Sequence, residues 1–529
     1  MNAPGPGGVS IESLRDPAAY PHEVEAPVRL VETHVSWVLL TGPYAYKIKK
    51  PVKLAFLDYS TPSRRRAFCE EELRVNRRLA PGLYLETVPI VRTTGGLHVG
   101  DAAGAVVEHA VRMVQFDTRE ELDALVARGD VGRAELAGFG TELGRLHDTA
   151  PIAPAAKLYG SPALVKQVVA DNFAELGRLV ARDAARRQAA RVRAWGDSVF
   201  DALEPLLNER RRSGWIRECH GDLHCANVVR WRGHLTPFDA IEFDPALRCI
   251  DVANDVAFLT MDLAARGRAD LRMALLNAWV ESLGDYAALP LLPYYETYRA
   301  VVRAKVAALR AGQARRDEAS GLAAQSAVER YLGWASSRTE RRTPGLVLTC
   351  GLSGSGKTWL ARRLSDECDA LHLRSDVERK RLAGLTPLAD SRSPPDAGIY
   401  TREFNAKTYA RLAECATACL QGGEHVIVDA ASLRREERRE LLQVATGQGV
   451  RAAIALCTAP IETLRSRIAA RRSAGADASE ADIALLDRQP AYWEPLTDDE
   501  RRIAVVVDAS RPHSVEDAVE RLKATLVRD

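Results

Sequence analysis

The chain has 529 residues, 46% of them apolar and 27% charged, which is typical of a globular protein too long for one hydrophobic core. Its 73 Lys and Arg residues against 71 Asp and Glu leave a net charge of +2, so no overall field attracts nucleic acid or membrane. The nine cysteines form no Cys-x-x-Cys pair, and their odd number argues against a disulfide framework. With no signal peptide and no apolar run of about 18 residues, the sequence predicts a cytoplasmic protein that does not enter a membrane.

The first part of the chain shows strand patterns and then helix patterns. Residues 34–40 and 45–50 are apolar-alternating runs on either side of a Thr-Gly-Pro-Tyr turn, which predicts a β-hairpin. A helix is expected from Ser63, followed by a strand pair near 84–114. Long helical patterns then run from about 118 to 213. This order is typical of an α+β arrangement.

The stretch HGDLHCANVV at 220–229 matches the pattern H-x-D-x-x-x-x-N, the catalytic loop of eukaryotic-type kinases, with Gly in place of Arg. In that loop the Asp accepts the proton of the acceptor hydroxyl and the Asn binds Mg²⁺. Asp222 is therefore the candidate base and Asn227 the candidate metal ligand. A second metal-binding carboxylate is expected after the next strand, where both Asp239 and Glu242 fit.

On these motifs the N-terminal half resembles the aminoglycoside phosphotransferases, also called kinase-like phosphotransferases. The resemblance implies a bilobal, protein-kinase-like domain in which a lysine and a helix glutamate pair over ATP. Lys47 is the candidate lysine, and Lys49, on the same face of the strand, is the alternative. Glu72 is the candidate glutamate, with Glu71 as the alternative. No Gly-rich loop precedes the lysine, so the segment that covers the phosphates is not predicted.

A polar, charge-dense segment separates this half from the remainder of the chain. The expected division is a kinase-like domain at 1–334, a linker at 335–344 and a second domain at 345–529. In the second domain, five apolar runs alternate with helical patterns, which predicts a parallel sheet in an α/β arrangement.

The stretch GLSGSGKT at 351–358 lies between a predicted strand and a predicted helix and matches the phosphate-binding loop pattern G-x-x-x-x-G-K-[ST]. Lys357 is expected to neutralise the β- and γ-phosphates of ATP, and Thr358 to offer its hydroxyl to Mg²⁺. The loop residues expected to surround the phosphate are Gly351, Ser353, Gly354, Ser355 and Gly356.

Polar residues follow the next strands of this domain, at the edge of the sheet where ligands bind. Asp376 is the candidate base for an acceptor hydroxyl, and Arg379 is expected to hold an anionic acceptor. Asp429 is expected to orient the water of the metal, and Arg471 to stabilise the transferring phosphoryl group. The domain is similar to the P-loop polynucleotide kinases and, more loosely, to the gluconate kinases and zeta toxins.

The whole chain resembles a bacterial two-domain family in which an aminoglycoside phosphotransferase-like domain is fused to a P-loop domain. This predicts a bifunctional kinase that uses ATP and Mg²⁺ at two sites. The expected acceptors are the hydroxyl groups of a small metabolite or sugar, or an RNA or DNA 5′-end. In the alternative, one half catalyses while the other is a nucleotide-sensing or RNA-binding regulatory module. The sequence leaves both acceptors and the oligomeric state open.

Overall fold

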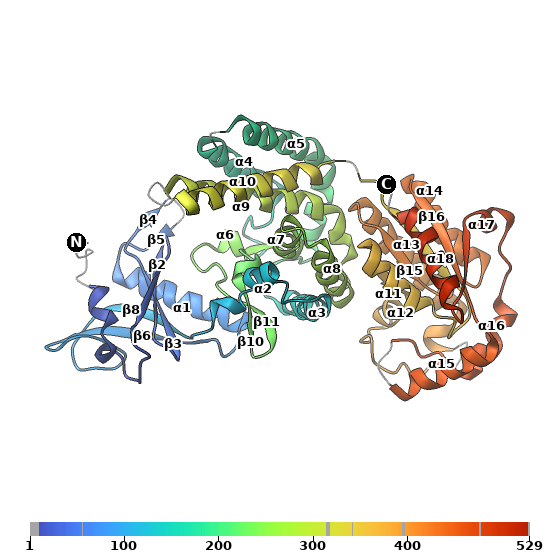
Figure 1. The fold of residues 1–529 in the computed structure, drawn as a ribbon, viewed down its shortest axis with the longest axis horizontal. Coiled ribbons are helices and arrows are strands. Elements are labelled where there is room, and N and C mark those ends of the chain that lie inside the picture. Colours follow the sequence, from blue (N-terminus) through green and yellow to red (C-terminus); the bar gives the residue numbers. More distant parts are fainter. Residues whose placement is uncertain are drawn as a thin grey trace. The chain divides into compact units, whose positions relative to one another are not determined.

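A computed structural model of the chain describes residues 10–526, apart from 55–56, 181, 314–317, 341, 394–396 and 475–477. The chain splits into two compact units (Figure 1). The first unit is formed by Met1–Glu135, Leu146–Val168 and Glu204–Asp262, and the second by Leu136–Arg145, Val169–Leu203 and Leu263–Asp529. The second unit therefore contains helices that precede the expected linker, and residues 335–338 of that linker belong to helix α10 (Glu318–Arg338).

The first unit is built on a six-stranded antiparallel sheet in the order β1-β2-β3-β8-β6-β7, drawn mainly in blue in Figure 1. The expected hairpin is present as β2 (Ser36–Leu40) and β3 (Tyr44–Lys49), and the helix expected from Ser63 is α1 (Pro62–Leu79). Its first turn is capped by the hydroxyl of Thr61, which accepts the N–H of Arg64. The other strands are β1 (Arg29–Glu32), β6 (Tyr84–Thr93), β7 (Gly96–Val99) and β8 (Ala105–Val114), with a separate short pair β4 (Lys53–Leu54) and β5 (Leu57–Asp58).

Two short antiparallel pairs carry the H-x-D loop. Strand β9 (Ile216–Glu218) pairs with β12 (Cys249–Asp251), and β10 (Val228–Trp231) pairs with β11 (His234–Pro237). The loop joins β9 to β10, and the two candidate carboxylates come after β11. The helices and 3₁₀-helices of this part of the chain are η1 (Glu12–Arg15), η2 (Pro17–Ala19), η3 (Thr118–Glu120), α2 (Leu122–Arg128), α3 (Arg133–Thr149), η4 (Cys225–Asn227), α6 (Pro245–Arg248) and α7 (Val252–Ala265).

The second unit contains the predicted parallel sheet, which is confirmed. Five strands run parallel in the order β14-β15-β13-β16-β17. Apolar side chains of α11 and α18 cover one face, and α13 and α14 lie on the other. The strands are β13 (Gly345–Cys350), β14 (Leu371–Arg374), β15 (Val426–Asp429), β16 (Arg451–Thr458) and β17 (Ala504–Asp508). These are the five apolar runs of the sequence, and their carboxyl ends share one edge of the sheet.

Helices precede, connect and follow these strands. Those before the sheet are α4 (Pro162–Leu179), α5 (Asp183–Arg212), α8 (Ala269–Leu283), η5 (Tyr286–Leu291), α9 (Leu292–Gln313) and α10. Those within the sheet region are α11 (Lys357–Cys368), α12 (Ser375–Leu382), η6 (Gly398–Tyr400), α13 (Arg402–Gln421), α14 (Arg435–Gln448), α15 (Ile461–Ala474), α16 (Ile483–Tyr492), α17 (Asp498–Arg502) and α18 (Pro512–Leu526). Among the described residues, no helix combines the length and apolar character needed to cross a membrane. All nine cysteines are buried and free of disulfides.

Candidate active sites

In the first unit, one lysine joins two of the predicted carboxylates. Lys47 on β3 donates to Glu72 Oε1 of α1 at 2.7 Å and also to Asp239, just beyond β11. Although burial opposes it, Lys47 and Lys49 lower the pKa of Glu72 to about 2. Burial also opposes the charge on Lys47, but the charges of Asp239 and Glu72 raise its pKa well above the usual value. Sheet, helix and loop thus bring one cation and two anions together.

A second lysine makes a deeper set of contacts beside the first. Lys49 Nζ lies 2.5 Å from Glu72 Oε2 and also pairs with Glu242, which accepts the hydroxyl of Tyr59 at 2.5 Å. The side chains of Lys49 and Glu242 are only 1% and 6% exposed, whereas that of Asp239 is 44% exposed. The contacts therefore separate a buried internal pair, Lys49–Glu242, from a pair that reaches solvent, Lys47–Asp239. The alternative glutamate, Glu71, instead pairs with Arg74 and Arg248.

The candidate base and metal ligand of the H-x-D loop are in contact. Asn227 Nδ2 donates to the backbone oxygen of Asp222 at 2.9 Å and to its Oδ2 at 3.2 Å. His224 Nε2 lies 3.5 Å from the same carboxylate oxygen. The N–H of Phe238 donates to the backbone oxygen of Asn227 at 2.9 Å. This bond places the loop directly beside the residue that precedes Asp239.

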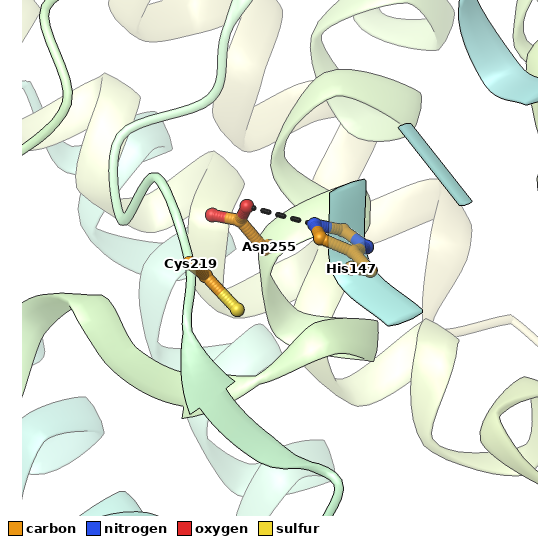
Figure 2. A group of neighbouring side chains, drawn as sticks. All are labelled: His147, Cys219 and Asp255. Carbon is orange, nitrogen blue, oxygen red and sulfur yellow. Dashed lines mark hydrogen bonds and ion pairs between the residues drawn. The ribbon is translucent and has the colours of Figure 1, made fainter. Parts of the chain in front are cut away.

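Helix α7 braces this loop. The carboxylate of Asp255 accepts the N–H groups of His220 at 3.1 Å and Gly221 at 2.8 Å, and it bonds the ring of His147 at 3.1 Å (Figure 2). Burial raises the pKa of Asp255, but the hydrogen bond and charge of His147 outweigh it and bring the pKa to about 2. Two turns later, Asp262 accepts the N–H of Cys225 at 3.0 Å. The loop is thus held at both ends by one helix.

Figure 2 places the thiol of Cys219 beside His147 and Asp255, a group that could suggest a metal site. Burial raises the pKa of Cys219 well above its usual value, so the sulfur stays a neutral thiol, a poor metal ligand. It donates to the backbone oxygen of Ile250 at 3.6 Å. The group therefore acts as a structural brace. Sequence reasoning missed His147, because no local pattern links it to Asp255, 108 positions away.

The phosphate-binding loop of the second unit has the predicted strand-loop-helix setting. Gly354 and Gly356 have φ angles of 80° and 94°, which favour glycine, and a Cβ at Gly354 would lie 2.8 Å from the backbone oxygen of Leu464. Lys357 Nζ donates to the backbone oxygens of Gly351 and Leu352 at 2.9 and 2.8 Å, and burial lowers its pKa.

Two serines of the loop differ in their contacts. Ser355 Oγ is buried, and among the described residues it has no hydrogen-bond partner. In contrast, the N–H of Ser353 donates to Gln489 Oε1 at 2.7 Å, and Gln489 Nε2 donates to Ser353 Oγ at 3.0 Å. Gln489 lies on α16, and sequence reasoning did not identify it. The cradle fits a phosphate group, with the Ser353 N–H already engaged.

Oxygen atoms suited to Mg²⁺ meet next to the loop. Asp429 ends β15, and its carboxylate bonds His372 Nε2 at 3.1 Å, with the hydroxyl of Thr358 close enough to lower its pKa. Burial raises the pKa of Asp429, but the hydrogen bond and charge of His372, the hydroxyl of Thr358 and the charge of Lys357 together lower it. Hydroxyl and carboxylate oxygens are the ligands that Mg²⁺ prefers, directly or through water. These residues therefore fit the metal that the motif implies.

A cavity of about 700 Å³ lies at the carboxyl ends of the strands and brings the predicted residues of this unit together. Lys357, Thr358, Asp376, Asp429 and Arg471 all line it. Among the described residues, the carboxylates that line it are Asp376, Asp429 and Glu437. The arginines are Arg362, Arg374, Arg379, Arg402, Arg434, Arg467 and Arg471. The lining is strongly cationic, which suits phosphates and other anions.

Arg379 is held rigidly in this lining. It donates to the backbone oxygen of Ile399 at 2.9 Å and to Asn405 Oδ1 at 2.7 Å, and its guanidinium carbon lies 5.4 Å from the ring centre of Tyr400. Among the described residues its buried Nε has no partner, and the same holds for the Nε of Arg471, whose Nη2 donates to the backbone oxygen of Ala481 at 3.0 Å. Both arginines keep donor capacity for a ligand.

Comparison with known proteins places the chain in a family. A family model described as an AAA domain matches residues 346–496, which contain the phosphate-binding loop. Uncharacterized proteins of Mycobacterium tuberculosis and Mycobacterium bovis are each 30% identical to this chain over 480 residues, covering 90% of the chain and 93% of the relative. The chain belongs to the family of these proteins. The resemblance of its N-terminal half to aminoglycoside phosphotransferases stays a prediction.

Solved structures were also compared with the chain. A gluconokinase from Sinorhizobium meliloti is 22% identical, with 35% of this chain and 96% of that chain covered and a TM-score of 0.26. An APS kinase of Mycobacterium tuberculosis, solved with AMPPNP and APS, is 23% identical, with 35% and 99% covered and a TM-score of 0.27.

Proposed function

We propose that the second unit is an ATP-dependent kinase that phosphorylates a hydroxyl group of a small, anionic acceptor. The observation that supports this most strongly is the cavity at the carboxyl ends of the parallel strands. It combines the phosphate-binding Lys357, the oxygen pair Thr358 and Asp429, and the carboxylate of Asp376. This set of groups suffices for phosphoryl transfer, which requires mainly positioning and charge stabilisation.

Each residue has a role in this proposal. The loop N–H groups and Lys357 bind the β- and γ-phosphates, and Thr358 and Asp429 hold Mg²⁺ directly or through water. The metal, when bound, neutralises charge on the phosphate oxygens. Asp376 accepts the proton of the acceptor hydroxyl as its oxygen bonds the γ-phosphorus, the bond to the β,γ-bridging oxygen breaks, and ADP leaves. Arg471, which lines the cavity, stabilises negative charge on the transferring group.

The charge and size of the cavity support the choice of acceptor class. Its arginines outnumber its carboxylates, and after ATP is bound Arg379 and Arg434 remain for an acidic group on the acceptor. A volume of about 700 Å³ is within the range of small-molecule sites. This favours a small acid over a nucleic-acid end, and a 5′-hydroxyl oligonucleotide belongs in the test as the competing acceptor.

For the first unit we infer a second phosphotransferase site of kinase-like type. Lys47, oriented by Glu72, binds phosphate oxygens, and Asp222 accepts the proton of the acceptor hydroxyl. Asn227 and Asp239 hold the metal. Asp239 is preferred over Glu242, and Lys47 over Lys49, because the Lys49–Glu242 pair is buried and the Lys47–Asp239 pair reaches solvent. In the alternative, this unit binds nucleotide and regulates the other.

The test is transfer of labelled γ-phosphate from ATP to a panel of organic acids, sugars, nucleosides, aminoglycosides and 5′-hydroxyl oligonucleotides. The variants are Asp222→Asn and Asp376→Asn, and the matched control is Asp498→Asn, whose side chain is 84% exposed. Two active sites predict that each variant loses a different acceptor and that the control loses none. If Asp376→Asn retains transfer to every acceptor that the wild type phosphorylates, the P-loop kinase proposal is wrong. If Asp222→Asn retains transfer to every acceptor while Asp376→Asn does not, the first unit is regulatory.

A further inference from the structure

Helix α8 supplies a side chain to the edge of the parallel sheet. Strand β14 is the outer strand, so its outward N–H and C=O groups have no neighbouring strand to bond. Asn277 of α8 takes that place: its Oδ1 accepts the N–H of His372 at 2.8 Å, and its Nδ2 donates to the backbone oxygen of Ala370 at 3.1 Å. The amide therefore pairs with β14 as a further strand would and sets the position of His372.

Buried ion pairs hold α8 to the rest of the second unit. Arg272 of α8 pairs with Glu296 at 2.9 Å and with Glu424 at 2.7 Å. Arg338 bonds the same two glutamates at 2.8 and 2.9 Å, which closes a ring of two cations and two anions. All four side chains are buried, so loss of any one would leave an unpaired charge inside the protein. Because Glu424 lies two residues before β15, the ring fixes α8 against the start of that strand.

The ring of His372 links this edge to the candidate metal site. His372 is paired with Ile427 in the sheet, so it shares a face with Asp429, two residues further along β15. Its Nε2 lies 3.1 Å from Asp429 Oδ2, and the two side chains are only 11% and 6% exposed. The nearby hydroxyl of Thr358 also lowers the pKa of Asp429. A continuous set of hydrogen bonds therefore runs from α8 through His372 to the carboxylate beside the phosphate-binding loop.

We propose that His372 is a positioning residue for Asp429 and that Asn277 of α8 holds His372 in place, so that the metal side of the P-loop site depends on a helix more than 60 residues before the loop. A donor that fixes one carboxylate oxygen leaves the other free for the metal or its water, and such outer contacts raise metal affinity about 10- to 100-fold. This inference rests on the proposed ATP site of the second unit.

A second contact of α8 points the same way. Glu281 lies one helical turn after Asn277, hence on the same face of the helix. Its carboxylate is 3.7 Å from Arg374, which lines the cavity, and its backbone oxygen accepts a hydrogen bond from Arg381. One face of α8 therefore contacts both the edge strand and a cavity-lining arginine.

The test compares the ATP affinity of the full chain in Mg²⁺ with that in EDTA, by calorimetry. We expect His372→Leu to reduce the gain in affinity on adding Mg²⁺ about tenfold, with the affinity in EDTA unchanged. Asp429→Asn should reduce this gain by at least as much. The double variant, His372→Leu with Asp429→Asn, should reduce it no further than Asp429→Asn alone, because both changes act on one contact. The control is His513→Leu, since His513 is 99% exposed.

Asn277→Ala extends the test to the helix. It should reduce the Mg²⁺ gain in the same direction and speed hydrogen exchange at 371–374, because the N–H of His372 loses its acceptor. His372→Leu keeps that N–H bond and should leave the exchange unchanged. If His372→Leu does not fold, His372→Phe replaces it, because its ring is similar in size and has no donor for Asp429.

The outcomes separate this inference from the proposed function. Lys357→Ala reports the binding left at any other nucleotide site, and if it binds ATP as the wild type does, the P-loop ATP site itself is refuted. If Asp429→Asn loses the Mg²⁺ gain while folded His372→Leu or His372→Phe keeps all of it, the positioning role is overturned and the proposed function stands.

Discussion

The two candidate sites differ in how their charges are balanced. In the first unit, Lys47 and Lys49 are already paired with Glu72, Asp239 and Glu242 within hydrogen-bond distance. In the second unit, seven arginines and Lys357 outnumber the three carboxylates among the described residues that line the cavity. The first site balances its lysines with carboxylates, and the second keeps an excess of cations for an anion.

Because of this difference, we expect the two sites to bind ATP in different ways. At the cationic cavity a polyanion adds contacts without breaking any between side chains, so binding is favoured by charge alone. At the paired site the phosphates must draw Lys47 from Asp239, and that exchange is balanced only when a metal takes over the carboxylate. We therefore expect nucleotide binding to depend more strongly on Mg²⁺ in the first unit than in the second.

The largest effect is expected where the reserve of positive charge is removed. Lys357→Ala should lower transfer by the P-loop site about 10³-fold, because the charge on the β- and γ-phosphates loses its nearest cation. The initial rate of labelled phosphate transfer measures it, with Lys407→Ala, on an exposed side chain, as the control. A fall of less than about tenfold would contradict the interpretation of the cavity as an anion site.

Changes to the buried Lys49–Glu242 pair of the first unit should lower the free energy of unfolding. Glu242→Gln is expected to lower the free energy of unfolding by about 3 kcal/mol, because it leaves Lys49 buried with one partner fewer. Asp239→Asn should cost less, since that side chain is 44% exposed, but it should weaken Mg²⁺-dependent ATP binding. Urea unfolding of both variants checks this. Equal losses of stability would mean that the two carboxylates are not divided into a structural and a ligand-facing group.

The acceptor side of the cavity gives a smaller effect. Arg379→Lys should raise the KM of the acceptor about tenfold and leave the KM of ATP unchanged, since a lysine cannot keep the two held N–H groups and offer a third. Steady-state kinetics with the acceptor found in the panel measure both values. A rise in the KM of ATP instead would place Arg379 on the nucleotide side.

The smallest effect is expected in how the free energy of unfolding depends on pH, through Glu72 of the paired site. The pKa of Glu72 is lowered from its usual value of 4.5 to about 2. The charged carboxylate therefore stabilises the fold at pH values above 4.5, and this contribution is lost as the pH falls toward 2. Between pH 6 and pH 4 the loss is about 1 kcal/mol. Glu72→Gln should therefore unfold in urea with a correspondingly weaker dependence on pH in this range. An unchanged dependence would show that Glu72 is not the charged partner of the lysines.

Local patterns of the sequence determined much of the architecture of the second unit. Five apolar runs separated by helices specify a parallel sheet, because a strand buried on both faces must be apolar throughout. The loop at 351–358 was recognisable because its glycines and Lys357 meet requirements of the backbone within eight residues. The hairpin that carries Lys47 was recognisable for the same local reason.

Only the tertiary structure decided how deeply each side chain is buried and which residues far apart in the sequence meet. Lys47 and Lys49 lie on the same face of one strand, so periodicity could not separate them, and burial did. Asn277 meets His372 across 95 residues, and no local pattern records such a contact. The sequence by itself thus predicted a chemistry for each half, because those motifs are short. The packing of distant helices decided how the chemical groups are held, because partners for buried polar atoms are found only when the chain folds.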